Sequence, residues 1–167
     1  PTCHPQLKEI IEFIGENGME VSLTTNGQLL NDDIIAAAIK HCTWIRVSLD
    51  ADGPKIYKRM HGMDEHAFSQ VIKNIANLVE KRKKLHSETV IGVTYLIGSH
   101  TVEGVYNAAT LAKKLGVDYI RIRPFFTWDD AKKIDIRDKE SLTETYTTKR
   151  DGSQRVFPPR PVREAKS

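Results

Sequence analysis

Short, almost continuously apolar runs alternate along the chain with longer segments in which apolar residues recur at helical spacing. This alternation restricts the possible folds more than any other feature, because neighbouring parallel strands need a crossover helix between them and antiparallel strands do not. The pattern predicts an α/β fold with a parallel sheet, either an α/β barrel or an open doubly wound sheet, whose helices cover the outer surface of the sheet. The four predicted strands are EVSLT, WIRVSLD, TVIGVTYLI and DYIRIRPF.

Four predicted helices occupy the remaining segments. The first, over residues 6–17, is followed by Gly18, which is a typical residue at the end of a helix. The second begins after Asn31, which is a good N-terminal cap. The third and fourth are expected over residues 66–85 and about 103–115, the last closed by Gly116.

Composition excludes several classes of protein. The 167 residues are 40% hydrophobic and 28% charged, which is typical of one globular domain or a large piece of one. No apolar run is long enough to span a membrane and the first residues show no signal region, so a cytoplasmic location without a membrane partner is expected. The net charge of +3 is small for a nucleic-acid binder. Two cysteines, and six histidines without ligand spacing, predict no metal site within this chain.

Polar residues follow each predicted strand at the same end. In parallel α/β folds the carboxyl ends of the strands form one rim, where ligands bind. A turn or a helix cap explains each cluster taken alone, but the recurrence after all four strands favours a binding site. The residues are Thr24, Thr25, Asn26 and Gly27 after the first strand, Ser48, Asp50 and Asp52 after the second, Thr94, Tyr95 and Gly98 at the third, and Arg121 and Arg123 in the fourth.

Ser48 and Asp50 form the most informative pair in this rim. They lie two residues apart in a strand, so their side chains project to the same side. A hydroxyl beside a carboxylate suits the vicinal hydroxyls of a ribose, as acidic residues do in dinucleotide sites. Arg121 and Arg123 also share a side, where one of them could pair with Asp50 or with an anionic part of a ligand. The residues alone therefore predict a polar ligand with a sugar-like part.

Several short motifs occur in a characteristic order. TTNG ends one strand and SLD the next, followed by FSQVIKNIANLVEK and then by VTYLIGSHTVEGVYNAATLAKKLGVDYIRIRP. This order resembles that of the radical S-adenosylmethionine (radical SAM) superfamily, and PTCHPQLKEII is similar to the segment that follows the glycine-glycine-glutamate strand end of that family. The resemblance covers residues 1–126, about three-quarters of the chain.

The resemblance implies a partial (β/α)6 TIM-like barrel, incomplete at its N-terminus, that holds S-adenosylmethionine (SAM) and a 4Fe-4S cluster at the carboxyl ends of its strands. Such enzymes cleave SAM reductively to a 5′-deoxyadenosyl radical, which acts here on an unknown small-molecule or peptide substrate, with an electron donor such as a flavodoxin or ferredoxin. By position, the resemblance implies ribose contacts from Ser48 and Asp50, contacts to SAM or substrate from Thr24, Thr25 and Asn26, and a place near the adenine for Leu96, Gly98 and Arg123.

The cluster-binding motif of the family, CxxxCxxC, is missing from this sequence. The two cysteines, Cys3 and Cys42, lie 39 positions apart, where the family has no cluster ligands. The resemblance therefore implies a fragment of the core domain whose cluster ligands lie upstream and which is inactive alone. Residues 127–167 are charged and proline-rich near their end, and we expect a C-terminal extension that is partly irregular or disordered.

Two other classes of function remain open. The first is a noncatalytic or degenerate barrel-fold protein that keeps the fold for binding. The second is another TIM-barrel enzyme, such as an aldolase or a phosphosugar-binding protein. The absence of a lysine at any strand end, and of a glycine-rich phosphate loop after the last strands, counts against this second class.

Overall fold

Four parallel strands form the main part of the sheet in the computed structural model, which describes residues 1–124, 146–148 and 154–156. Each strand lies beside the one that precedes it in the chain, in the order β1-β2-β3-β4. A doubly wound sheet reverses its strand order, whereas a barrel adds each strand on the same side. The prediction of a parallel α/β fold is thus confirmed, in its barrel-type form. The strands are β1 (Val21–Thr25), β2 (Cys42–Ser48), β3 (Val90–Ile97) and β4 (Tyr119–Pro124).

Two short strands extend the sheet beyond β4. They are β5 (Tyr146–Thr148) and β6 (Gln154–Val156), and both pairings, β4 with β5 and β5 with β6, are antiparallel. The other residues of the predicted extension, 127–167, lie outside the described part of the chain, and so does the prediction made for them.

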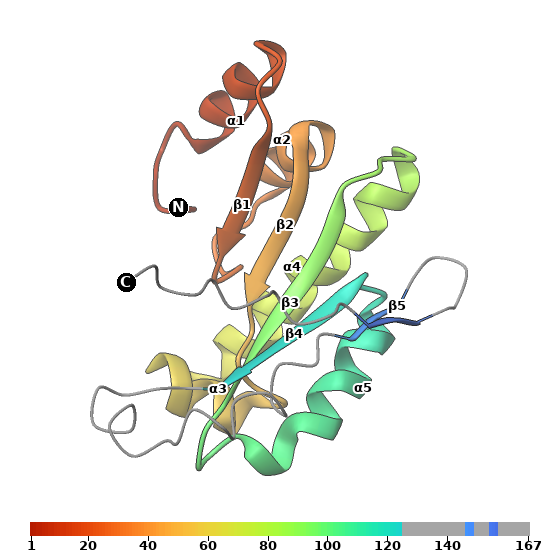
Figure 1. Cartoon of the computed structure of the whole chain (residues 1–167). Coiled ribbons are helices and arrows are strands. Elements are labelled where there is room, and N and C mark those ends of the chain that lie inside the picture. Colours follow the sequence, from red (N-terminus) through yellow and green to blue (C-terminus); the bar gives the residue numbers. More distant parts are fainter. Residues whose placement is uncertain (125–145, 149–153, 157–167) are drawn as a thin grey trace, which may run out of the picture.

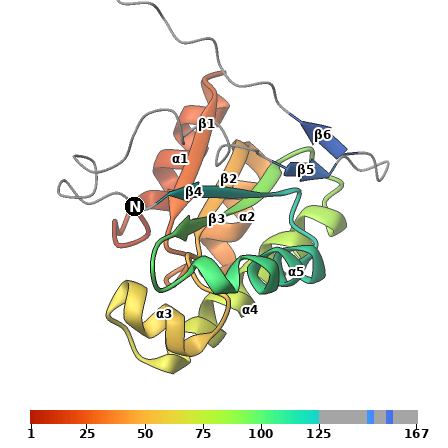
Figure 2. The ribbon, with the colours of Figure 1, turned by 60° about the horizontal axis from the view of Figure 1, so that its bottom comes forward.

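The helices lie against one face of the sheet, as Figures 1 and 2 show for α2, α4 and α5. Asn31 caps α2 as predicted, because its Oδ1 accepts a hydrogen bond of 2.9 Å from the N–H of Ile34. Gly116 ends α5 with a positive φ of 75°, which only glycine adopts without strain. These helices are α1 (Leu7–Glu16), α2 (Asp32–His41), α4 (Glu65–Lys84) and α5 (Val105–Leu115), with a 3₁₀ turn, η1 (Val102–Gly104), before α5.

The hydrophobic core fills the space between the sheet and these helices. Its strand residues are the alternate, inward-facing ones, and its helix residues form the predicted apolar stripes. Among the described residues no helix is both long and apolar enough to cross a membrane. Core residues with no exposed surface include Ile45 and Val47 of β2, Ile91 and Val93 of β3, and Val71, Ile75 and Leu78 of α4.

The sequence pattern did not predict one of the helices. The short α3 (Pro54–His61) follows β2 and begins with proline at its first turn, where a missing N–H costs nothing. It ends at Gly62, whose φ is 67°. Only Tyr57 is fully buried among its eight residues, so the helix is too short to show an apolar period.

Candidate functional site

The face of the sheet opposite the helices carries polar side chains in ordered rows. In β1 the exposed residues alternate with the buried ones, and β2 follows the same rule. Strand register aligns these residues across the sheet, because parallel neighbours pair residue by residue. We call this surface the open face. Its rows are Thr24, Arg46, Gly92 and Tyr119, then Ser48, Thr94 and Arg121, and finally Leu96 and Arg123 nearest the carboxyl rim.

Ser48 and Asp50 lie where the sequence predicts them, at the carboxyl end of β2. Ser48 is paired in register with Thr94 of β3. The backbone N–H of Asp50 donates a hydrogen bond of 3.1 Å to the carbonyl of Thr94, so β2 stays against β3 beyond its last strand residue. Asp50 has a φ of 49°, a left-handed conformation that is uncommon outside glycine and that concentrates at functional sites.

The carboxylate of Asp50 is buried and incompletely paired. Its residue is only 6% exposed, and its Oδ1 atom has no hydrogen-bond partner among the described residues. Burial raises the pKa of Asp50, while the charge of His61 and hydrogen bonding from Thr94 and the Leu96 backbone lower it. A buried acceptor without a donor is costly, so it indicates a ligand that brings a hydroxyl or N–H group. A sugar hydroxyl is one such group.

Helix α3 supports the backbone that leads to Asp50. The Nε2 atom of His61 donates to the carbonyl of Leu49 at 3.1 Å, and the His61 ring stacks on Tyr57 with centroids 4.3 Å apart. Gln28, from the loop after β1, donates to the hydroxyl of Tyr57 at 3.3 Å. The loops after β1 and β2 are thus joined through α3, a connection that sequence reasoning missed because α3 itself showed no pattern.

The TTNG turn after β1 divides its residues between two tasks. Thr24 is exposed on the open face and Asn26 is exposed at the rim. Thr25 is buried, and its hydroxyl accepts from the N–H of Gly27 at 3.1 Å and lies 3.3 Å from the hydroxyl of Thr2. Asn74 of α4 holds the turn from behind by donating to the carbonyl of Gly27 at 2.7 Å. The first residues of the chain therefore lie at this rim, beside β1.

The ends of β3 and β4 complete the rim. Thr101 is 1% exposed and fixes the turn after β3, since its hydroxyl donates to the carbonyl of Leu96 at 2.6 Å and accepts from the N–H of Gly98 at 2.8 Å. Leu96 is paired in register with Arg123, whose side chain is exposed. The structure thus brings Ser48, Asp50, Leu96 and Arg123 to adjacent strand ends, with Thr24 and Asn26 at the end of β1.

The cysteines lie apart from one another and do not suit an iron–sulfur cluster. Cys42 is buried at the amino end of β2, opposite to the rim, and burial raises the pKa of its thiol to about 11. Cys3 is exposed near the start of the chain. Within the described ranges no three histidine, cysteine, aspartate or glutamate side chains gather as metal ligands. The residues of this chain do not fit a 4Fe-4S cluster.

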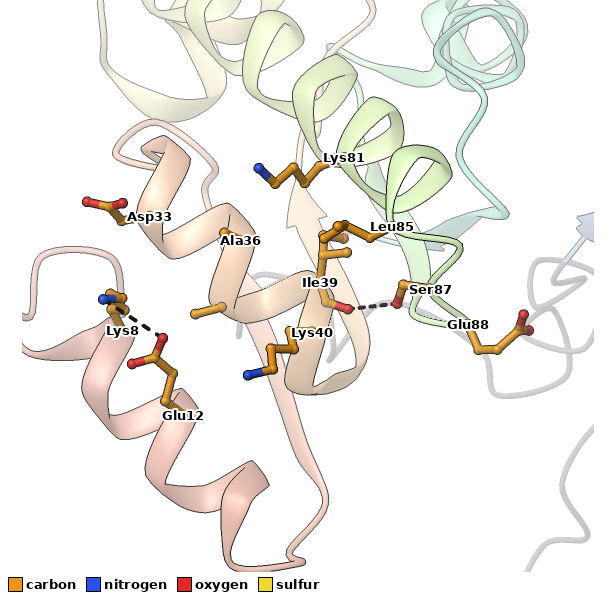
Figure 3. A pocket seen from close by; sticks show the side chains of 11 residues that line it. Lys8, Glu12, Asp33, Ala36, Ile39, Lys40, Lys81, Leu85, Ser87 and Glu88 are labelled. Atoms are coloured by element: carbon orange, nitrogen blue, oxygen red, sulfur yellow. Dashed lines mark hydrogen bonds and ion pairs between the residues drawn. The ribbon is translucent and has the colours of Figure 1, made fainter.

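A groove of about 660 Å³ lies on the helix layer between α1, α2 and the end of α4 (Figure 3). Three lysines and three acidic residues surround its apolar floor, so it selects for neither sign of charge. Its Ser87 hydroxyl already donates to the carbonyl of Ile39 at 2.7 Å. This groove contains none of the rim residues. The lining charges are Lys8, Lys40 and Lys81 with Glu12, Asp33 and Glu88.

Because the Asp50 carboxylate is buried, we expect that removing its negative charge stabilises the fold. Because the folded pKa is raised, the folded state binds more protons than the unfolded state between the two pKa values, and stability falls as the pH rises through that interval. We expect Asp50→Asn, which tolerates the same φ, to melt at a higher temperature than the parent at pH 7, with the difference vanishing below the ordinary carboxyl pKa of about 3.9.

The matched control is Asp33→Asn, which removes the same charge from the exposed first turn of α2. A carboxylate there interacts favourably with the helix dipole, so its loss gives no gain. Thermal melting followed by circular dichroism across this pH range measures both variants. A lower melting temperature for Asp50→Asn at pH 7 would contradict the assignment of Asp50 as a destabilising, buried charge.

Comparison with known proteins identifies the family. Residues 1–99, more than half of the chain, match the family model of the radical SAM superfamily. The chain belongs to this superfamily. Radical SAM enzymes generally use SAM together with a 4Fe-4S cluster.

Other known proteins are similar to this chain in sequence or in structure. A probable GTP 3′,8-cyclase from Saccharolobus islandicus is 28% identical over 97% of this chain and 52% of its own length, and one from Sulfolobus acidocaldarius is 28% identical over 86% and 47%. The chain thus spans about half the length of these relatives. SuiB of Streptococcus suis, solved with SAM bound, superposes with a TM-score of 0.66 at 16% identity, covering 85% of this chain and 31% of SuiB. An archaeal TYW1 gives 0.57 at 21%, over 91% and 50%. These two likenesses show the shared fold.

Proposed function

We propose that this chain forms the SAM-binding part of a radical SAM enzyme. The observation that carries the proposal is the buried Oδ1 atom of Asp50 at the carboxyl rim of a barrel-type sheet, which no donor among the described residues contacts. The ribose of SAM supplies hydroxyl donors of the required kind. Ser48, the last residue of β2 and two positions before Asp50, provides a second polar group for the neighbouring hydroxyl.

The remaining rim residues take the other parts of SAM. Leu96, near the end of β3, and the turn at Gly98 bind the adenine. Arg123 lies across from Leu96 on β4. Thr24 and Asn26 face the methionine portion or the substrate from the end of β1, while Thr25 holds the turn in shape. Bound SAM would supply a 5′-deoxyadenosyl radical when one electron from a reduced 4Fe-4S cluster breaks its sulfur–carbon bond and methionine is released. The residues of this chain bind and orient its nucleoside.

The full reaction requires groups that these residues do not provide. A 4Fe-4S cluster with ligands outside this chain and an electron donor such as a flavodoxin or ferredoxin would be needed for reductive cleavage. The substrate is a small molecule or a peptide. Similarity to probable GTP 3′,8-cyclases favours a small molecule, although at 28% identity it does not single out the same substrate.

Isothermal titration calorimetry of the 167-residue chain with SAM tests the binding proposal. We expect saturable binding of SAM and of S-adenosylhomocysteine, which share the nucleoside, and no binding of methionine, because this chain contacts mainly the ribose and adenine. Binding of methionine but not of S-adenosylhomocysteine would contradict the ribose assignment. Anaerobic reconstitution of the gene product with iron and sulfide, with 5′-deoxyadenosine as the readout, then separates a radical enzyme from a noncatalytic SAM binder.

A further inference from the structure

Arg46 stands in the middle of the open face between two aromatic rings. Its guanidinium carbon lies 4.6 Å from the centroid of Trp44, two residues earlier on β2, and 5.9 Å from that of Tyr119 on β4. Its Nε atom donates a hydrogen bond of 3.0 Å to the hydroxyl of Tyr119. Cation–π contacts and this hydrogen bond hold the guanidinium in one place.

Gly92 makes this arrangement possible. Arg46, Gly92 and Tyr119 are register partners on β2, β3 and β4, so Tyr119 must reach across a whole strand to meet Arg46. A Cβ atom at position 92 would lie 2.1 Å from the Tyr119 ring, which shows that the ring covers this glycine directly. Glycine weakens the interior of a strand. Its presence there indicates that another group, here the Tyr119 ring, approaches the backbone more closely than a larger residue would allow.

In the part of the chain that the structure describes, the contacts with Trp44 and Tyr119 leave the terminal nitrogens of Arg46 without a hydrogen bond. Among the interactions of the described residues, Arg46 uses only its Nε atom and its π contacts, and it takes part in no ion pair there. Trp44, Arg46 and Tyr119 are all partly exposed on the open face. An oriented guanidinium with unused N–H groups is suited to bind two oxygens of a carboxylate or a phosphate at once.

The distance from the ribose site fits a substrate group. Arg46 precedes Ser48 by two residues on the same strand and the same face, which places it about 6–7 Å further from the rim. Arg121 lies one row nearer the rim, where it is paired in register with Thr94. A substrate whose anionic group binds Arg46 would thus lie next to the nucleoside, on the side away from the rim.

We propose that Arg46, oriented by Trp44, Tyr119 and Gly92, binds a carboxylate or phosphate group of the substrate. This inference rests on the proposed function for its link to catalysis, because it places the substrate beneath SAM. Arg46 makes the contact, and Trp44, Tyr119 and Gly92 are positioning residues.

Fluorescence of Trp44 reports directly on this site. The chain contains two tryptophans, and Trp128 lies outside the described residues, so a Trp128→Phe background leaves Trp44 as the sole reporter. Titration of the full chain at constant ionic strength uses inorganic phosphate in one arm and succinate in the other. We expect a saturable change; saturation by phosphate alone assigns a phosphate-bearing substrate, by succinate alone a carboxylate, and by both an oxyanion of either kind.

Three variants test the roles of the residues. Arg46→Gln should lower the affinity for the anion by about tenfold or more, as expected when a charged hydrogen-bonding partner is lost. Gly92→Ala keeps Arg46 but displaces the Tyr119 ring, and should lower the affinity for the anion several-fold. Lys113→Gln, an exposed residue of α5, removes the same charge and should leave the response unchanged.

SAM titrations of the same proteins separate the two proposals. Arg46→Gln and Gly92→Ala should keep the SAM affinity of the background protein, whereas misfolding would lower both affinities. If SAM fails to bind but the Arg46-dependent anion response persists, the proposed function fails and the anion site stands. The absence of a saturable response to either anion, or an equal loss in Lys113→Gln and Arg46→Gln, would overturn the proposal of an anion site.

Discussion

Replacing Asp50 by alanine lowers the affinity for SAM by about 10- to 100-fold, because a hydrogen bond to a charged acceptor contributes about 1.5–3 kcal/mol. The structure gives the reason for this large expected effect. Asp50 is buried and its Oδ1 atom has no partner within the described ranges, so the free protein bears a desolvation cost that we expect a ribose hydroxyl to relieve. Replacing Ser48 by alanine removes a neutral hydrogen bond and lowers the affinity less, by about 2- to 10-fold.

Ser22→Ala is the matched control for Ser48→Ala. Ser22 is an exposed serine near the amino end of β1, and its hydroxyl lies 3.0 Å from that of Thr43. The substitution removes the same group from the other end of the sheet and should leave SAM binding unchanged. Calorimetric titration measures all three variants. If neither Ser48→Ala nor Asp50→Ala binds SAM more weakly than Ser22→Ala does, the ribose assignment is wrong.

Replacing Asp118 by asparagine lowers the free energy of unfolding by about 3 kcal/mol, at the lower end of the range for breaking a buried ion pair. Asp118 accepts a hydrogen bond of 2.7 Å from the N–H of Ile91 and pairs through the same oxygen with Arg82. The Arg82 side chain is only 8% exposed. The substitution leaves this cation buried without its counter-charge, between α4 and the start of β3 and β4.

Two further variants establish the cause of this loss. Arg82→Met combined with Asp118→Asn removes both charges, so the double variant should be more stable than the sum of the two single losses predicts. Glu80→Gln breaks an exposed ion pair with Lys84 on the same helix and should leave the urea midpoint unchanged. Urea unfolding measures each free energy. Strict additivity of Arg82→Met and Asp118→Asn would show that the two side chains stabilise the fold independently.

The strands and the long helices could be read from the sequence because each depends on local pattern. Strand β3 begins at Val90, within one residue of the predicted start, and α4 ends at Lys84, within one residue of the predicted end. Asn31 and Gly116 mark helix ends through their own backbone and side-chain chemistry. The parallel direction of the strands followed as well, since helices separate all four.

The rim residues were predicted as a group, but their individual tasks were not. Ser48 and Asp50 were predicted to share a strand and a face, but β2 ends at Ser48 and Asp50 follows it with a left-handed backbone, so strand parity does not fix the direction of the Asp50 side chain. Thr25 was expected to face the ligand, yet its hydroxyl is engaged by Thr2 and by the N–H of Gly27. Alternation along β1 makes Thr24 and Thr25 point to opposite sides, and a prediction that applied parity to β1 as it did to β2 would have separated them. The contacts of all these residues with SAM stay predictions.

The amino-acid sequence by itself determined the succession of strands and helices and the end of the sheet at which polar groups gather. It also determined the order of motifs that resembles the family. All of these depend on spacing along the chain. Only the tertiary structure decided that the sheet is of the barrel type, that α3 supports Asp50 and that Tyr119 reaches over Gly92 to Arg46. Those features join residues up to 73 positions apart. No local pattern encodes such contacts, since they arise from strand register and from side chains that meet only after the sheet has formed.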